Sequence, residues 1–290
     1  MPSVHHRTIS VNGLEVFYRE AGPRGAPVIL LLHGYPTSSH MFRHLIPALA
    51  DKYRVIAPDH IGFGRSSAPS MDEFAYTFDA LTDVTAAFLR TVGVSKYSVY
   101  VQDYGAPIAW RLALAQPEAI ERVISQNGNA YEEGFVPEFW EPIWAYGKNP
   151  TQANEAALRP ALEQEAVQWQ YTHGVSDPTT VSPDTWEYDI ALLQRPGVDR
   201  AQLALFADYA SNRALYPKVH AWLRDSGVPV LAVWGKKDEI FGPDGATLFR
   251  RDAHNPQIEL LDGGHFLLES HLDEVSHIIR DWLASTRTRQ

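Results

Sequence analysis

The sequence predicts an α/β protein in which a mostly parallel central sheet is flanked by helices and interrupted by a helical insertion. Short apolar segments such as residues 28–32 and 230–235 are typical of strands that are covered on both faces, as in parallel sheets. An amphipathic segment, residues 73–92, predicts one of the helices that connect such strands. Between residue 131 and residue 216 no convincing strand occurs, and aromatic residues and prolines are frequent instead.

These patterns divide the chain into a core, residues 1–130 and 217–290, and a helical cap, residues 131–216. A helical insertion between strands commonly acts as a lid over the carboxyl edge of the sheet, where α/β proteins bind ligands. The chain should begin with a β-hairpin, because Asn12-Gly13 is a strong signal for a tight two-residue turn.

Composition limits the classes of function. The chain has 290 residues, a formal net charge of −10 and no cysteine. The acidic balance argues against a nucleic acid or an anionic membrane as partner, and the lack of cysteine excludes thiolate nucleophiles. No apolar segment is long enough to be a signal or a membrane span, so we expect a cytoplasmic protein. The segment Gly62-Phe63-Gly64 lacks the rest of a phosphate-binding motif, and neither a cofactor nor a metal is expected.

An acidic residue stands at a predicted sharp corner between a strand and a helix. The strand over residues 97–101 leads through Gln102 to Asp103, and the small residues Gly105 and Ala106 allow a tight turn. A carboxylate exposed at such a corner can attack a saturated carbon and form an alkyl ester on the protein. The alternative is that Asp103 only caps the following helix, which is the commonest role of Asp at such a boundary.

Two further polar residues follow late strands. Asp238 comes shortly after the strand over 230–235, and His265 follows the next predicted strand. Each could separately be a turn or capping residue, but nucleophile, acid and histidine in this chain order are typical of a hydrolase triad. Asp238 is the preferred acid of this set, and Glu239 and Asp244 are the alternatives.

With these motifs the chain resembles the α/β-hydrolase family and, within it, the branch of epoxide hydrolases and haloalkane dehalogenases. The resemblance covers nearly the whole length, and it rests on the helical cap and on four motifs: His33-Gly34-Tyr35-Pro36, Gln102-Asp103-Tyr104-Gly105-Ala106, Trp234-Gly235-x-x-Asp238 and Gly264-His265-Phe266. It implies an α/β-hydrolase fold and a small hydrophobic organic substrate. In such a reaction Asp103 forms the ester, and His265, oriented by Asp238, activates the water that hydrolyses it.

The resemblance also implies how other residues contribute. The backbone N–H groups of Tyr35 and Tyr104 would form the oxyanion hole. Side chains in the same region would contact the substrate, namely His33, Pro36, Trp144 and Tyr171.

The two branches differ in their leaving group. An epoxide oxygen departs as an alkoxide and needs a proton, whereas a halide needs only donors such as an indole N–H. Dehalogenases typically carry Trp after the nucleophile, where this chain has Tyr104, and epoxide hydrolases carry two cap tyrosines. By resemblance these are Tyr209 and Tyr146, with Tyr171 as the substitute for Tyr146. Gln102 before the nucleophile is more typical of dehalogenases, so haloalkane dehalogenation is the alternative to epoxide hydrolysis.

A third hypothesis is a protein with a hydrolase-like fold that only binds a small ligand. The combination of Asp103, Asp238 and His265 favours an enzyme. The sequence leaves homodimer formation open.

Overall fold

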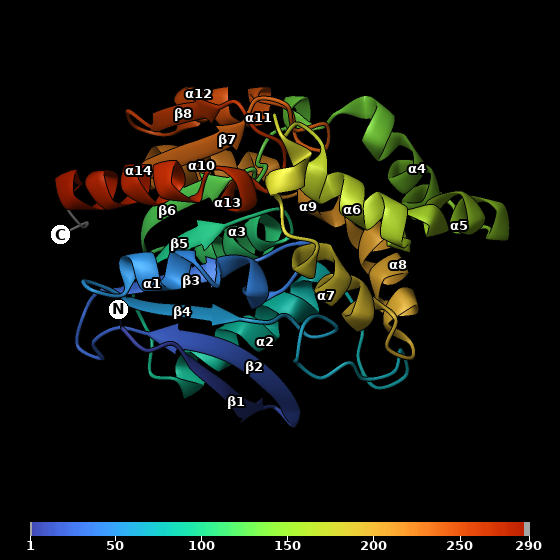
Figure 1. The fold of residues 1–290 in the computed structure, drawn as a ribbon. Helices are drawn as coiled ribbons and strands as arrows, with labels where there is room; N and C mark the ends of the chain where they lie inside the picture. Colours follow the sequence, from blue (N-terminus) through green and yellow to red (C-terminus); the bar gives the residue numbers. More distant parts are fainter. Residues whose placement is uncertain (1, 287–290) are drawn as a thin grey trace.

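The computed structural model describes residues 2–286 and contains one eight-stranded sheet with helices on both faces (Figure 1). Its strands are β1 (His5–Val11), β2 (Leu14–Ala21), β3 (Val28–Leu32), β4 (Arg54–Pro58), β5 (Tyr97–Val101), β6 (Ile120–Gln126), β7 (Val230–Gly235) and β8 (Gln257–Leu261). The strand order is β1-β2-β4-β3-β5-β6-β7-β8. β2 pairs antiparallel with β1 and β4, and the other pairs are parallel, which confirms the predicted α/β class. Met1 and residues 287–290, at the two ends of the predicted core, lie outside the described residues.

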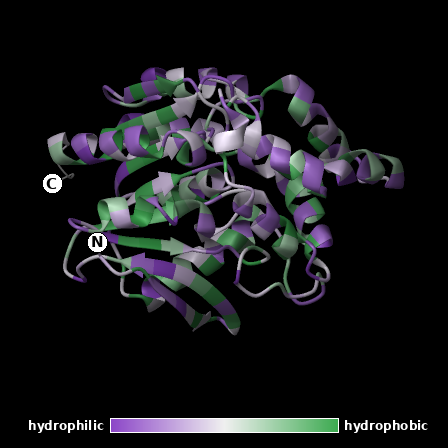
Figure 2. Cartoon of the chain, viewed as in Figure 1, coloured by the Kyte–Doolittle hydropathy of each residue, from purple (hydrophilic) through white to green (hydrophobic). Residues whose placement is uncertain are grey.

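Strands in the middle of the sheet are apolar because both of their faces are covered. Every residue of β5 and β7 is buried, whereas the edge strand β1 is largely exposed or half-buried. Figure 2 shows the same contrast as hydrophobic colouring of the central strands. The predicted hairpin joins β1 to β2, and Asn12 and Gly13 adopt the positive φ angles, 53° and 83°, that such a turn requires.

Helices cover the two faces of the sheet. α2 and α10 both contact α3 on one face, and α1 contacts α14 on the other (Figure 1). α2 is shorter than the predicted helix over 73–92, because Thr77 is extended and its hydroxyl caps the helix by accepting from the Ala80 N–H. The core helices are α1 (Leu45–Leu49), α2 (Phe78–Thr91), α3 (Gly105–Ala115), α10 (Tyr216–Ser226), α11 (Asp244–Thr247), α12 (Phe249–Asp252), α13 (Leu267–Ser270) and α14 (Leu272–Ser285).

A group of helices is inserted between β6 and β7. They occupy the segment that the sequence assigns to the cap and lie together at one side of the molecule, on the right in Figure 1. They are α4 (Pro137–Lys148), α5 (Gln152–Leu158), α6 (Gln164–Thr172), α7 (Asp184–Leu193), α8 (Val198–Asp208) and α9 (Ala210–Arg213).

Polar contacts fix the cap on the core. Arg111 of α3 is buried, and its guanidinium donates to Asn212 Oδ1 at 2.6 Å and to Ser211 Oγ at 2.9 Å. The Asp208 carboxylate accepts from the backbone N–H of Phe78 at 2.8 Å. The end of the cap is therefore tied to the first turn of α2 and to α3, the helix that follows the predicted nucleophile.

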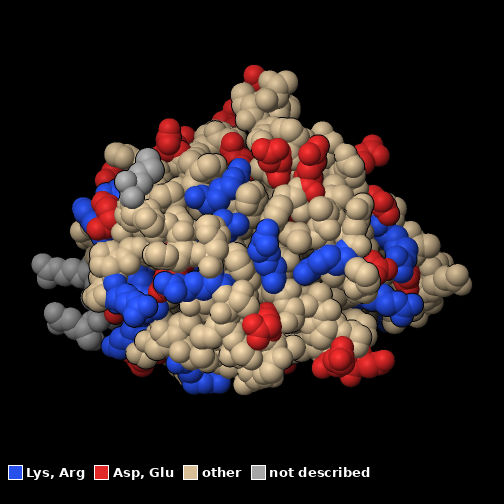
Figure 3. Space-filling view, turned by 60° about the horizontal axis from the view of Figure 1, so that its bottom comes forward, with Lys and Arg blue, Asp and Glu red and all other residues tan. Residues whose placement is uncertain are grey.

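The surface carries both signs of charge. On the face shown in Figure 3, basic side chains form a broken row across the middle, and acidic side chains lie mainly above and below it. No helix within residues 2–286 is long and apolar enough to cross a membrane.

Arg111→Met is expected to lower the free energy of unfolding by about 2–4 kcal/mol, because each lost hydrogen bond to a charged donor is worth about 1.5–3 kcal/mol. Urea unfolding monitored by circular dichroism measures the change. The exposed Arg90 of α2 provides a matched control, and Arg90→Met should stay within about 0.5 kcal/mol of the wild type. Equal stability of the two variants would contradict the role assigned to Arg111.

Candidate active site

Asp103 stands at the corner between β5 and α3. Its backbone is in the left-handed region, with φ of 47°, which side chains other than glycine rarely adopt. Neighbouring chain segments approach this corner closely: a Cβ on Gly105 would lie 2.1 Å from the Leu32 carbonyl oxygen, and a Cβ on Gly34 would lie 2.3 Å from the Asp103 side chain. No side-chain capping bond begins α3, so the structure does not support Asp103 as a simple helix cap.

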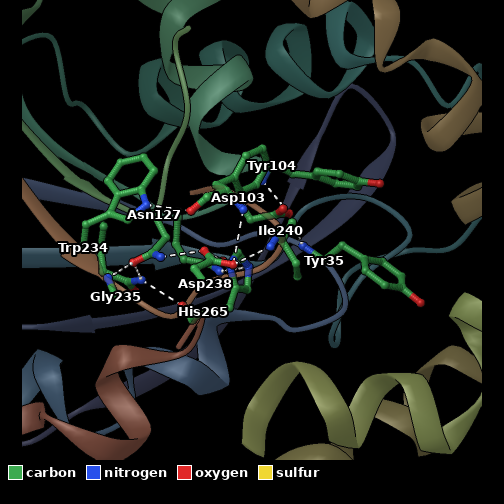
Figure 4. A network of polar contacts seen from close by, with 12 residues as sticks. Tyr35, Asp103, Tyr104, Asn127, Trp234, Gly235, Asp238, Ile240 and His265 are labelled. Atoms are coloured by element: carbon green, nitrogen blue, oxygen red, sulfur yellow. Dashed lines mark hydrogen bonds and ion pairs between the residues drawn. The ribbon is translucent and has the colours of Figure 1, made fainter. Parts of the chain in front are cut away.

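The two oxygens of the Asp103 carboxylate have different surroundings. Oδ1 accepts hydrogen bonds from the backbone N–H of Tyr35 at 2.7 Å and of Tyr104 at 2.6 Å (Figure 4). Both hydrogen bonds of the carboxylate involve Oδ1, and Oδ2 has no partner in the part of the chain that the structure describes. One oxygen is therefore held in a cradle of two N–H donors while the other is free to act as a nucleophile.

Burial determines the acidity of this carboxyl group. Loss of hydration raises the pKa of Asp103 to about 6, although His265 and the two backbone N–H donors act in the opposite direction. A carboxylate that is poorly hydrated and still ionised near pH 7 is a better nucleophile than one in bulk water.

His265 and Asp238 meet at the ends of the last two strands. His265 Nδ1 lies 2.8 Å from Asp238 Oδ2, and both side chains are buried. Burial by itself lowers the pKa of His265, but the charge and hydrogen bond of Asp238, with a smaller contribution from Asp103, raise it overall. Asp238 Oδ1 accepts from the backbone N–H groups of Ile240 and Phe241 at 2.8 and 3.2 Å. The arrangement fixes an imidazole with its Nδ1–H on Asp238 and its Nε2 toward the site.

Sequence reasoning missed a polar frame behind this pair. Asn127, which follows β6 in a left-handed conformation with φ of 50°, donates to Asp238 Oδ2 at 2.6 Å. Its own Oδ1 accepts from Gln126 Nε2 at 2.7 Å and from the Gly235 N–H at 3.2 Å (Figure 4). Its position in the sequence could have indicated this role, since Asn127 directly follows a strand end, as Asp238 does.

Gln102 contacts the other nitrogen of the histidine. Its Nε2 lies 2.6 Å from His265 Nε2, and its Oε1, although fully buried, has no partner. With Nδ1–H on Asp238, Nε2 carries the lone pair and accepts from the amide. Gln102 therefore occupies the lone pair that a general base would use, and it must move aside when water approaches.

Aromatic rings from the core and from the cap form a wall beside Asp103. The ring of Tyr104 lies 5.7 Å from that of Tyr209 and 5.0 Å from that of Phe78 between centroids, and Tyr209 packs 4.4 Å from Trp140. Phe206 completes the wall next to Tyr35, at 5.1 Å. Burial, together with Tyr216 and Asp103, raises the pKa of Tyr209 well above 10, so its phenol keeps its proton at neutral pH.

The predicted residues are only partly brought together. Those that gather at one place are Asp103, Asp238, His265, Tyr35, Tyr104 and Tyr209. Tyr146 is not among them: the charges near its phenol are Glu155, Arg159 and Arg200, and no described ring of the aromatic wall contacts it. It lies on α4, and α4 packs against α5 and α8 within the cap.

The residues expected to contact substrate also differ in position. Both ring nitrogens of His33 bind backbone, Nδ1 the carbonyl of Gly34 and Nε2 the N–H of His60, which leaves neither for a ligand. The Tyr171 phenol donates to Asp189, and its ring stacks 4.0 Å from Phe266, so it does not replace Tyr146 as a free phenol. Pro36 follows Tyr35 in the loop beside Asp103, and Trp144 packs on Trp140 at 5.0 Å, behind Tyr209.

The alternatives to Asp238 are not part of the pair with His265. Glu239 lies 3.2 Å from His173 at the surface, and Asp244 begins α11. Neither contacts His265 in the described residues, so the geometry agrees with Asp238 as the acid.

Fold and site geometry define a hydrolase of the α/β type, and a family model agrees. The model described as alpha/beta hydrolase fold matches residues 27–272, and the chain belongs to this family. An uncharacterized hydrolase of Saccharomyces cerevisiae is 44% identical over 278 residues, covering 94% of this chain and 95% of that protein.

Relatives with named activities come from both branches. A haloalkane dehalogenase of Mycolicibacterium paratuberculosis is 40% identical over 278 residues, covering 93% of this chain and 87% of that protein. Epoxide hydrolase A of Mycobacterium tuberculosis is 37% identical over 132 residues, covering 45% of this chain and 41% of that protein. Membership of a hydrolase family with such relatives supports an enzyme. The relatives include both branches, so they do not distinguish an epoxide oxygen from a halide as the leaving group.

The rate of ester formation should fall about tenfold per pH unit below pH 6, because protonation of Asp103, whose pKa is raised to about 6, removes the nucleophile. Above pH 6 the carboxylate form dominates and the rate should level off. Rapid-quench single-turnover experiments from pH 5 to 8 measure this step directly. A flat profile over that range would contradict the assignment.

Asn127→Asp should slow turnover by about 10- to 100-fold, because a second carboxylate replaces the amide that donates to Asp238 and disturbs the acid–histidine pair. The loss should appear in ester hydrolysis more than in ester formation. Asn255→Asp is the control. Asn255 is also in a left-handed conformation, with φ of 49°, but it is exposed, so this variant should keep wild-type rates. Burst kinetics separate the two steps.

Proposed function

We propose that the protein hydrolyses epoxides to vicinal diols through a covalent ester on Asp103. One observation carries the proposal: the free oxygen of a buried carboxylate faces an aromatic wall that contains protonated phenols. The nucleophile needs ionisation and the leaving oxygen needs a proton, and the site offers both at neutral pH.

In the first step Asp103 Oδ2 attacks a ring carbon of the epoxide. The new C–O bond forms as the strained C–O bond breaks, and its electron pair goes to the leaving oxygen. Tyr209 donates a proton to that oxygen, which yields a hydroxyalkyl ester. The phenol of Tyr209 is buried and keeps its proton at neutral pH, so it is available as a donor.

In the second step water hydrolyses the ester. His265 Nε2 takes a proton from the water, which attacks the carboxyl carbon of Asp103, and Asp238 stabilises the resulting imidazolium. The negative charge on Oδ1 is held by the N–H groups of Tyr35 and Tyr104, which already lie at 2.7 and 2.6 Å. Collapse of this intermediate breaks the ester C–O bond, and the departing alkoxide takes the proton of the His265 imidazolium to give the diol. Asp103 then loses its remaining proton to solvent and returns to the carboxylate.

Hydrogen bonding near the site favours an epoxide over a halide. The indole N–H of Trp140, which packs on Tyr209, is engaged with the Ile240 carbonyl oxygen at 2.8 Å. The Trp140 indole is therefore not free to donate to a halide, whereas phenols are available beside it. The substrate class is a small hydrophobic epoxide, because the wall is built of aromatic rings, and the reaction needs no cofactor.

Haloalkane dehalogenation is the second candidate function. It uses the same nucleophile, and two observations favour it: Gln102 precedes Asp103, and a haloalkane dehalogenase is 40% identical over most of the chain. A phenol can also donate a hydrogen bond to a departing halide.

His265→Gln should form the ester and fail to hydrolyse it, because only the second step needs a general base. Intact-protein mass spectrometry after exposure to styrene oxide should show an added mass, located on Asp103 by peptide mapping. Wild-type protein is offered styrene oxide and 1-bromobutane in parallel, with diol and bromide as readouts. Bromide release without diol formation would overturn the epoxide proposal in favour of the second candidate, and an unmodified variant that still binds the epoxide would overturn the role of His265.

A further inference from the structure

Tyr104 carries a buried phenol that has no partner. Its side chain is 2% exposed, and its hydroxyl makes no hydrogen bond in the structure. A buried hydroxyl without a partner destabilises the fold relative to one that is satisfied. Phenylalanine would give the same ring without this cost, so packing alone does not account for a tyrosine at this position.

Tyr104 lies next to the proposed nucleophile both in the sequence and in space. Tyr104 directly follows Asp103, and its backbone N–H holds Asp103 Oδ1 at 2.6 Å. Figure 4 shows its ring extending away from His265, on the side of the Asp103 carboxylate. The ring lies 5.7 Å from that of Tyr209, so one phenol from the core and one from the cap stand in the same wall.

Other phenols near Asp103 are engaged or distant. Tyr35 donates to the Ala161 carbonyl oxygen at 2.8 Å, and Tyr171 donates to Asp189. Tyr146 has no contact with the wall in the described residues. Among these phenols, Tyr104 is the one whose hydroxyl is buried without a partner in the described residues.

The surroundings of Tyr104 also keep its phenol protonated, as a proton donor must be. Burial raises the pKa of Tyr104 well above 10, and the nearby Asp103 carboxylate raises it further, so the phenol is protonated at neutral pH. When Asp103 becomes a neutral ester, that second influence disappears. The phenol thus becomes more acidic while negative charge develops on the leaving oxygen.

We propose that Tyr104 is the second proton donor of epoxide opening and acts with Tyr209, in place of a second cap tyrosine. This inference rests on the proposed function. As the Asp103 oxygen forms its bond to carbon, the breaking C–O bond leaves its electron pair on oxygen. That oxygen receives the proton of either phenol and hydrogen-bonds to the other. The tyrosinate that results recovers a proton from solvent, which balances the proton that the Asp103 carboxyl group releases to solvent after ester hydrolysis.

The geometry of displacement agrees with this placement. The leaving oxygen departs on the side of the carbon opposite to the attacking carboxylate. Its donors must therefore stand beyond the substrate carbon rather than beside Asp103. In Figure 4 the Tyr104 ring runs past the Asp103 carboxylate, so its hydroxyl lies away from the attacking oxygen, as this geometry requires.

The test compares Tyr104→Phe, Tyr209→Phe, their double variant and Tyr146→Phe, with Tyr131→Phe as matched control. Tyr131 is also fully buried, but it packs against Phe249 and His220, away from the aromatic wall. Single-turnover ester formation is measured with 1,2-epoxybutane and with 3,3,3-trifluoro-1,2-epoxypropane, whose alkoxide is far less basic. Thermal unfolding is measured for each variant.

We expect Tyr104→Phe to slow ester formation from epoxybutane about 10- to 100-fold and from the trifluoro epoxide much less, because a less basic leaving oxygen needs less acid assistance. Its stability should equal or exceed that of the wild type, and the double variant should be slower than either single variant. Tyr131→Phe should keep the wild-type rate.

Three results would overturn the inference. These are an unchanged rate in Tyr104→Phe, an equal loss with both epoxides, and a loss in Tyr146→Phe that matches that of Tyr209→Phe. In each case the wild type would still make diol, so the proposed function would stand. A wild type that makes no diol from any of these epoxides would instead refute the proposed function itself.

Discussion

The strained corner at Asp103 is the feature on which the site depends. A φ of 47° is unfavourable for an aspartate, and it persists because β5 and α3 are both buried and hold the chain on either side of it. This conformation directs the carboxylate to two backbone N–H groups that lie on different segments. In the proposed reaction, the donors that orient the ground-state carboxylate would also bind the oxyanion, so little rearrangement would be needed.

Dehydration is the second condition that governs the chemistry. The site is lined by aromatic rings, and burial shifts the pKa of three of its acidic groups, one carboxyl group and two phenols. It raises the pKa of Asp103 only to about 6, which leaves it ionised at pH 7, and it keeps the phenols of Tyr104 and Tyr209 protonated. One aromatic wall thus supports both a base-like nucleophile and weak acids, because it disfavours charge on every group that lacks a compensating partner.

Polar side chains behind the reacting groups provide that compensation. Asp238 accepts from Ile240, Phe241 and Asn127 and therefore stays in place as the partner of His265. Gln102 contacts the opposite nitrogen of the imidazole. The histidine is held on both sides, so its tautomer is decided by hydrogen bonds and does not depend on a bound ligand.

The sequence by itself determined the strand and helix pattern and the chain order of Asp103, Asp238 and His265, because buried parallel strands and strand-end motifs are local signals. It could not place Tyr146 outside the wall or find the contacts of Asn127 and Gln102. Those facts depend on how α4 packs within the cap and how three strand ends converge, and neither is encoded at short range. A tyrosine in a cap sequence looks the same whether its phenol lies in an aromatic wall or among charged neighbours, and only tertiary packing placed the Tyr146 phenol near Glu155, Arg159 and Arg200.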